Sequence, residues 1–218
     1  MADIDKPIKF TSEFTQRISQ KLSDPTFKIE DWSHEDLKDI RKFIRDYYRD
    51  LTKKCSYCRK EISLQSANNC HIEHIIPKSS NKKFMFEPKN LCVICSDCNE
   101  IKKNKEVEGN IDKVISNNKA YKQYPRSKDS FLIVHPHFDN YDEHIFHCDD
   151  IYIDLTPKGT YTMYICKLNR KIHKYGIEPI ALSQSELFDL FNKIMSEKNF
   201  TKQSILLNKL RSYFIKAS

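Results

Sequence analysis

The sequence of 218 residues contains no long hydrophobic run. Its longest uninterrupted stretch of aliphatic and aromatic residues is Phe-Leu-Ile-Val, from Phe131 to Val134. A helix that crosses a bilayer needs about 20 apolar residues, so the sequence excludes a membrane-spanning protein. The opening residues, Met-Ala-Asp-Ile-Asp-Lys, also lack the apolar segment of a secretory signal. We therefore expect a cytoplasmic protein that has no membrane partner.

Disulfide bonds are equally unexpected, because thiols remain reduced in the cytoplasm. The chain nevertheless contains 8 cysteines, and most of them fall between residues 53 and 106. Cysteines gathered in this way in a reducing compartment indicate metal binding rather than covalent bridges.

Acidic residues are in the minority, 30 against 37 Lys and Arg, which gives a net charge of +7. The positive excess is concentrated in residues 76–128, whereas residues 129–164 carry an excess of acids. Such a balance favours a polyanion as partner, or simply a solvated basic surface.

Hydrophobic periodicity predicts an α+β protein in three segments: helices over residues 1–52, a cysteine-rich core over 53–106, and strands and helices over 107–218. The three segments either share one core or form separate domains. Apolar residues at helical spacing after Ser33 predict a helix with one buried face. We expect its opposite face to be solvated, with the basic residues Lys38, Arg41, Lys42, Arg45 and Arg49.

The last segment contains a predicted β-hairpin and two predicted helices. Two β-rich runs, Ile151 to Leu155 and Tyr161 to Cys166, flank the turn-like sequence Thr-Pro-Lys-Gly-Thr. Ser183 and Glu186 have the spacing of a capping box at the start of the first of two amphipathic helices.

Two C-x-x-C pairs are the strongest chemical signal in the chain. Cys55 and Cys58 form the first pair, and Cys95 and Cys98 form the second. Two such pairs place four thiolates around one tetrahedral ion, which predicts a closed structural zinc site. Cys92, two residues before Cys95, offers a rival pairing.

Between the pairs lies a further pattern of polar residues. Glu73-His74 ends a predicted strand, Asn90 begins a second one, and Asn99 directly follows the last cysteine at the start of a predicted helix. In this order and spacing they resemble the HNH endonuclease motif in its zinc-knuckle form, over roughly residues 53 to 106. The resemblance implies a ββα-metal fold that hydrolyses DNA phosphodiester bonds. The sequence departs from the motif at Glu73, where aspartate is more usual, and at Asn99, which replaces the final histidine.

The residues of this motif suit the chemistry that the resemblance implies. A neutral imidazole accepts a proton from water near pH 7, so we expect His74 to be the general base. Carboxylate and amide oxygens suit Mg²⁺ or Mn²⁺, and the resemblance places ligands of this catalytic ion at Glu73 and Asn99. The resemblance also gives Asn90 the role of bracing the loop that orients the base.

Lysines follow the motif along the predicted helix. We expect Lys102 and Lys103 to contact phosphate oxygens as point charges. Arginine is the usual bidentate reader of guanine, and it is scarce in this chain, so we expect low sequence specificity on DNA. His71 lies one strand step from Glu73 on the same side, where packing is favoured over a role in the chemistry.

Several possible metal ligands gather between His135 and His144, in the sequence His-Pro-His-Phe-Asp-Asn-Tyr-Asp-Glu-His. A second metal site is conceivable there, but a polar turn is the preferred interpretation. Together with Cys166-Lys-Leu-Asn-Arg170, this stretch resembles the C-terminal half of the PtuB-type nuclease subunits of Septu and retron-associated anti-phage systems. That resemblance implies an antiviral defence role and an ABC-type ATPase partner of the PtuA type, and an oligomer within such a complex is compatible with it.

Two other functions are compatible with the same residues. The chain could be a non-catalytic zinc-stabilised subunit that binds nucleic acid or acts as a scaffold, in which case His74→Ala would leave its function intact. It could also be a stand-alone restriction or homing endonuclease.

Overall fold

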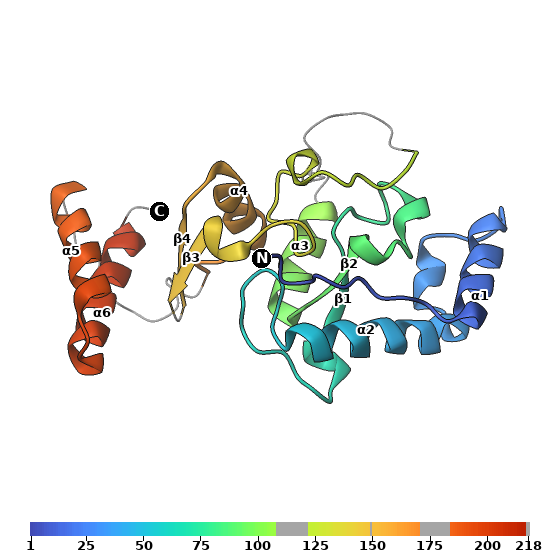
Figure 1. Cartoon of the computed structure of the whole chain (residues 1–218), viewed down its shortest axis with the longest axis horizontal. Coiled ribbons are helices and arrows are strands. Elements are labelled where there is room, and N and C mark those ends of the chain that lie inside the picture. The colour runs from blue at the N-terminus through green and yellow to red at the C-terminus, as the bar shows by residue number, and fades with distance from the viewer. Residues whose placement is uncertain (108–121, 149, 171–183, 217–218) are drawn as a thin grey trace. The chain divides into compact units, whose positions relative to one another are not determined.

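The computed structural model describes residues 1–107, 122–148, 150–170 and 184–216 (Figure 1). None of the helices in these ranges combines the length and apolar character that crossing a membrane would require. The regular elements, in chain order, are helices α1 (Ser12–Ser23) and α2 (Lys38–Thr52), strands β1 (His71–His74) and β2 (Leu91–Ile94), helix α3 (Ser96–Val107), strands β3 (Ile145–Cys148) and β4 (Ile151–Asp154), and helices α4 (Pro157–Cys166), α5 (Gln184–Ser196) and α6 (Phe200–Lys216).

The chain divides into two compact units. The first consists of Met1–Phe146 and Ile153–Lys167, and the second of His147–Tyr152 and Leu168–Ser218. All the residues that we predicted for the site belong to the first unit.

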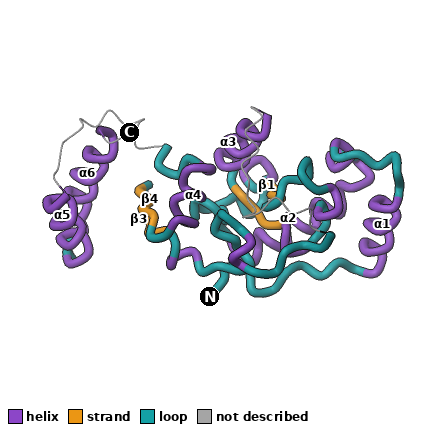
Figure 2. Tube along the Cα trace, turned by 90° about the horizontal axis from the view of Figure 1, so that it is seen from above, coloured by secondary structure: helices purple, strands orange, loops and turns teal. Residues whose placement is uncertain are grey.

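An antiparallel pair of strands, β1 and β2, forms the centre of the first unit. Its register places Glu73 opposite Cys92 and His74 opposite Leu91. Helices α2 and α3 both contact β1, as Figure 2 shows from above. All four residues of β2 are buried, so the short strand is a core element. The order β1, β2, α3 is the ββα arrangement that the sequence predicted.

Helix α2 packs on the sheet through Ile40, Ile44 and Tyr48, which are completely buried. Ser33 does not start this helix, contrary to our prediction. It ends a short 3₁₀ turn (Glu30–Ser33), where its hydroxyl donates to the carbonyl of Glu30 at 2.8 Å. A serine used inside a turn cannot also cap the following helix, which begins at Lys38.

The C-terminal segment contains a hairpin, but not the one that we predicted from Ile151–Leu155 and Tyr161–Cys166. Strands β3 and β4 pair across residues 145–154, whereas the run that we assigned as the second strand is helix α4. Thr156 caps this helix by accepting from the amide of Gly159 at 3.2 Å, and Pro157 occupies its first turn. Thr-Pro therefore marks the start of a helix here. Proline has no N–H group, but the N–H groups in the first turn of a helix have no partner within the helix, so nothing is lost.

Gly159 allows helix α4 to pack closely against the chain at His144. A Cβ atom at position 159 would lie 2.0 Å from the carbonyl oxygen of His144, a distance that no side chain permits. In the second unit α5 packs on α6, with Leu190, Ile194, Leu207 and Leu210 buried. The capping serine that we predicted at position 183 lies outside the described residues.

Candidate functional site

Four cysteines form a closed, buried cluster. Cys55 and Cys58 precede β1, Cys95 follows β2, and Cys98 lies in α3. Their sulfur atoms all lie within 4.8 Å of one another. Tetrahedral zinc with Zn–S bonds of about 2.3 Å spaces its sulfurs by about 3.8 Å, so the cluster fits a structural zinc ion. The clustering predicted from the two C-x-x-C pairs is confirmed, and Cys92 is no part of it.

The electrostatics of the thiols support the same conclusion. A hydrogen bond with Cys55 lowers the pKa of Cys95 below its ordinary value, whereas a hydrogen bond with the same Cys55 raises the pKa of Cys98. The thiols therefore compete for ionisation. A divalent cation among them would hold them all as thiolates, which is the form that binds zinc.

The second site is an open cavity of about 470 Å³ beside β1. Glu73 and His74 line it from the end of β1, and Asn99 lines it from the first turns of α3. The cavity thus brings together five of the residues that the sequence analysis considered for the site, since His71 and Lys102 line it as well. Residues that we did not connect with the site also line it, namely Trp32, Ser33, Arg41, Arg45, Pro77 and Lys78.

Glu73 is 8% exposed, and the hydrogen bonds that its carboxylate accepts from described residues all go to one oxygen. Its Oε1 atom accepts hydrogen bonds from Lys102 Nζ and from the Tyr57 hydroxyl, the latter at 3.1 Å. Lys102 Nζ also donates to the carbonyl of His74 at 3.1 Å. Among the described residues, Oε2 of Glu73 has no hydrogen-bond donor, so one carboxylate oxygen is free to bind a cation.

His74 is 7% exposed and has a defined tautomer. Its Nε2 atom lies 3.1 Å from the carbonyl oxygen of Met85, and a carbonyl only accepts, so Nε2 carries the proton and Nδ1 carries the lone pair. The ring of Trp32 contacts the imidazole edge to face at 4.6 Å between centroids. Burial, assisted by the positive charge of Lys78, lowers the pKa of His74 to about 3. The imidazole is therefore neutral at pH 7.

Asn90 is completely buried and braces the loop that follows His74. Its Oδ1 accepts from the amide of Ile76 at 2.7 Å, and its Nδ2 donates to the carbonyls of Ile76 and Phe84 at 3.1 and 2.9 Å. The side chain therefore ties the end of β1 to the segment that carries Met85, the partner of His74.

Lys102 and His71 have described side-chain contacts, whereas Lys103 does not. Lys102 lies 4% exposed against Glu73, whereas the side chain of Lys103 lies outside the described part of the chain. His71 lines the cavity, and its Nε2 donates to the carbonyl of Asn68 at 3.1 Å. The cations Arg41 and Arg45 were missed because a basic helix face is usually solvated, and only their spacing of four residues shows that they share a face.

Comparison with known protein families finds a match for one part of the chain. Residues 55–105 match the model of the HNH endonuclease family. The chain contains an HNH endonuclease domain. No curated protein and no solved structure matches the chain. The match covers the cysteine cluster, both strands and most of α3, and the family suggests a metal-dependent nuclease.

The stretch from His135 to His144 packs against the HNH domain as a polar brace. His137 Nε2 donates to the carbonyl of Leu91 at 2.8 Å, and the Tyr141 hydroxyl donates to the carbonyl of Tyr57 at 2.8 Å. Both acceptors belong to the HNH domain. In the described part of the chain, the four cysteines are the only group of three or more His, Cys, Asp or Glu side chains close enough together to hold an ion, so the ligand types between His135 and His144 do not form such a group.

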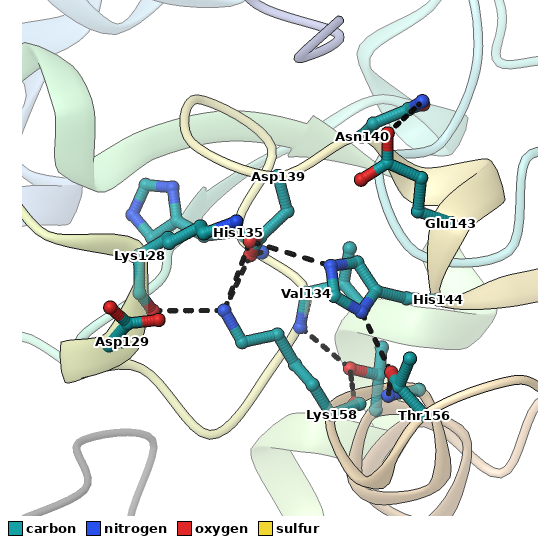
Figure 3. A network of polar contacts seen from close by, with 12 residues as sticks. Lys128, Asp129, Val134, His135, Asp139, Asn140, Glu143, His144, Thr156 and Lys158 are labelled. Carbon is teal, nitrogen blue, oxygen red and sulfur yellow. Dashed lines mark hydrogen bonds and ion pairs between the residues drawn. The ribbon is translucent and has the colours of Figure 1, made fainter.

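Asp139 is the centre of this brace (Figure 3). Its carboxylate accepts from the amide of His135 at 2.7 Å and from Lys158 Nζ at 2.8 Å, and His144 Nε2 lies 3.5 Å away. His144 in turn bonds the helix-capping hydroxyl of Thr156 at 2.7 Å. The network therefore fastens the start of α4 to the stretch that contacts the HNH domain, and a polar turn describes it better than a metal site.

Proposed function

We propose that this protein is a metal-dependent nuclease that hydrolyses phosphodiester bonds in DNA. The observation that carries the proposal is the cavity beside β1, where Glu73, His74 and Asn99 meet within a domain of the HNH family. Arg41, Arg45, Lys78 and Lys102 line the same cavity, against one carboxylate, so its positive excess suits a phosphate backbone.

His74 acts as the general base in this proposal. The Met85 carbonyl fixes the proton on Nε2, so the Nδ1 atom accepts the proton of the attacking water. The contact with Trp32 holds the plane of the imidazole ring. Asn90 keeps the loop that carries Met85 in place, and it therefore acts through His74 rather than on the substrate.

Glu73 and Asn99 would hold the catalytic divalent cation, with Mg²⁺ or Mn²⁺ as the ions that their oxygen donors suit. Such an ion supplies positive charge at the phosphate and at the leaving oxygen. Lys102 orients Glu73 through Oε1, which leaves Oε2 available. Lys102 thus contributes its charge to the cavity while it positions the carboxylate. For Lys103 the proposal remains a contact with phosphate oxygens.

We propose a DNA substrate recognised with low sequence specificity, because lysine dominates the basic residues and base readout by arginine is scarce. The similarity of the C-terminal half to PtuB-type subunits supports a role as the cytoplasmic effector of a bacterial anti-phage system. In that role an ABC-type ATPase would control the nuclease.

Plasmid nicking tests the proposal. Wild-type protein and His74→Ala are incubated with supercoiled plasmid in EDTA, Mg²⁺ or Mn²⁺, with and without a candidate ATPase. We expect nicking by the wild type alone, and only with added metal. Equal nicking by both proteins would remove His74 from the mechanism. Absence of nicking under every condition, with zinc still bound, would favour a non-catalytic nucleic-acid-binding or scaffold subunit.

A further inference from the structure

Arg45 reaches the candidate active site from outside the HNH domain. It lies in the middle of α2, upstream of residues 55–105, and lines the same cavity as Glu73, His74 and Asn99. The side chain is half-buried. The cavity is therefore built jointly by the HNH domain and by the helix that packs on its strands.

The bonding of Arg45 differs from that of its neighbours on the helix. Arg41 donates through Nη1 to the carbonyls of Trp32 and His34, at 2.5 and 2.7 Å. Arg49 pairs with Asp46. Within the described residues Arg45 has no acceptor for any of its donors, and its Nε is fully shielded from solvent. The Nε of Arg49 also lacks a partner, but its guanidinium is already neutralised by an ion pair.

An unpaired, partly desolvated guanidinium is an unfavourable arrangement unless a ligand completes it. Buried polar groups in native proteins almost always have a partner, and a buried charge needs one most. Among the described residues, Glu73 supplies the only carboxylate that lines this cavity, and Lys102 engages it. None of the described residues therefore supplies an anion to Arg45, and a ligand that enters the cavity could supply it.

We propose that Arg45 binds the non-bridging oxygens of a backbone phosphate of the nucleic acid that enters the cavity. The planar guanidinium presents parallel donors that match two oxygens of one phosphate. We assign it to a phosphate that flanks the scissile bond, so Arg45 binds the strand in ground and transition state alike and takes no part in proton transfer. The inference rests on the proposed nuclease function, and it adds α2 to the substrate-binding surface.

Substitution of Arg45 tests this assignment by equilibrium binding and by kinetics. Binding of duplex DNA is measured without added divalent metal over a range of salt concentrations, so that the structural zinc is retained, and kcat and KM for nicking are measured with metal. For Arg45→Gln we expect binding weaker by roughly tenfold to a hundredfold, and a salt dependence whose logarithmic slope falls by about one. KM should rise by a similar factor while kcat stays within about twofold, as expected for uniform binding.

Two further variants separate binding from folding. Lys42→Gln removes a cation from the exposed part of the same helix, where it pairs with Asp46, and should leave KM and the salt slope unchanged. Arg45→Lys keeps the charge without the planar fork and should fall between wild type and Arg45→Gln. It also provides the test if Arg45→Gln does not fold.

The outcomes are distinguishable from those of the proposed function. Unchanged KM and salt slope in folded Arg45→Gln, with an active wild type, would overturn the assignment and leave the nuclease intact. Binding that depends on Arg45 in a wild type that never nicks would support the assignment and contradict the catalytic proposal. No DNA binding by the wild type would overturn both.

Discussion

The cysteine cluster and the cavity beside β1 are made from the same short stretch of chain, yet they differ in access. The four thiols are buried and lie within 4.8 Å of one another, so an ion held by all four would have no position left for a substrate. Judged from the described residues, the cavity has one carboxylate oxygen without a donor, one imidazole nitrogen with a free lone pair and one arginine without an acceptor. Unfilled bonding capacity in the cavity, and its absence in the cluster, separates the candidate active site from the candidate structural zinc site.

A pair of histidines repeats this contrast at the level of single residues. His74 and His137 are both buried, and each donates Nε2 to a backbone carbonyl, that of Met85 and that of Leu91 respectively. Of these two histidines, only His74 lines the cavity. A buried neutral histidine is therefore no sign of chemistry by itself, because the adjoining space and its charges determine the role.

The largest effect should follow from breaking the cysteine cluster. Cys58→Ser removes a zinc ligand, and structural zinc sites contribute on the order of 10 kcal/mol to folding. We expect loss of zinc and of cooperative thermal unfolding. Cys70→Ser is the matched control, since Cys70 is equally buried but outside the cluster, and it should cost about 1–3 kcal/mol with zinc retained. Full zinc content in folded Cys58→Ser would contradict the structural assignment.

The next effect concerns the two histidines. His74→Ala should lower the nicking rate by roughly 10²–10⁴-fold, as for loss of a general base, with zinc content and fold retained. His137→Ala should reduce the free energy of unfolding but leave the rate per folded molecule unchanged. Single-turnover rates on one plasmid preparation compare the two. Equal losses of rate in both variants would contradict the proposal that the histidine lining the cavity has a catalytic role that His137 lacks.

Asn90→Ala tests the loop brace. The substitution removes the partner of the Ile76 amide and of the Ile76 carbonyl, whereas the Phe84 carbonyl keeps the hydrogen bond from the Glu87 amide. We therefore expect a loss of roughly 2–5 kcal/mol in urea unfolding. Asn81→Ala removes an asparagine that caps the short turn beside it and should cost about 1 kcal/mol. If the two variants were equally stable, Asn90 would not have the bracing role.

The smallest effect is a pH dependence of stability. Burial lowers the pKa of His137 to about 4, whereas its unfolded pKa is about 6.5. Between these values the unfolded chain binds more protons than the folded one, so stability rises with pH. We expect a loss of roughly 3 kcal/mol from this residue as pH falls from about 6.5 to about 4, and none above pH 7. Burial lowers the pKa of His135 as well, which adds a loss of the same sign.

Urea titrations at several pH values measure this dependence. His137→Gln should make the slope shallower, because the titrating ring is gone. An unchanged slope in that variant would show that His137 does not titrate differently in the folded and unfolded states.

The parts of the molecule that the sequence predicted well are those with a fixed spacing. The two C-x-x-C pairs predicted the cluster, and the short strands around Glu73 and Asn90 were placed within a residue of their observed bounds. Metal ligation and strand pairing depend on local geometry, so their spacing is visible in the chain.

Features that depend on distant contacts were predicted less well. Residues 157–166 have strand-like composition but form a helix, because Thr156 caps it and Gly159 lets it lie against His144. From the sequence alone, Arg45 resembles a solvated surface residue. In the structure it lines the cavity because α2 packs on the two strands. The periodicity of the sequence does not indicate which helices and strands will lie next to one another in the fold.

The most direct test of the central claim measures zinc content and nicking on the same preparations of wild type and His74→Ala. The account predicts equal zinc in both, nicking only by the wild type, and only after Mg²⁺ or Mn²⁺ is added. Nicking by His74→Ala at the wild-type rate, or nicking that follows zinc content without added metal, would contradict it.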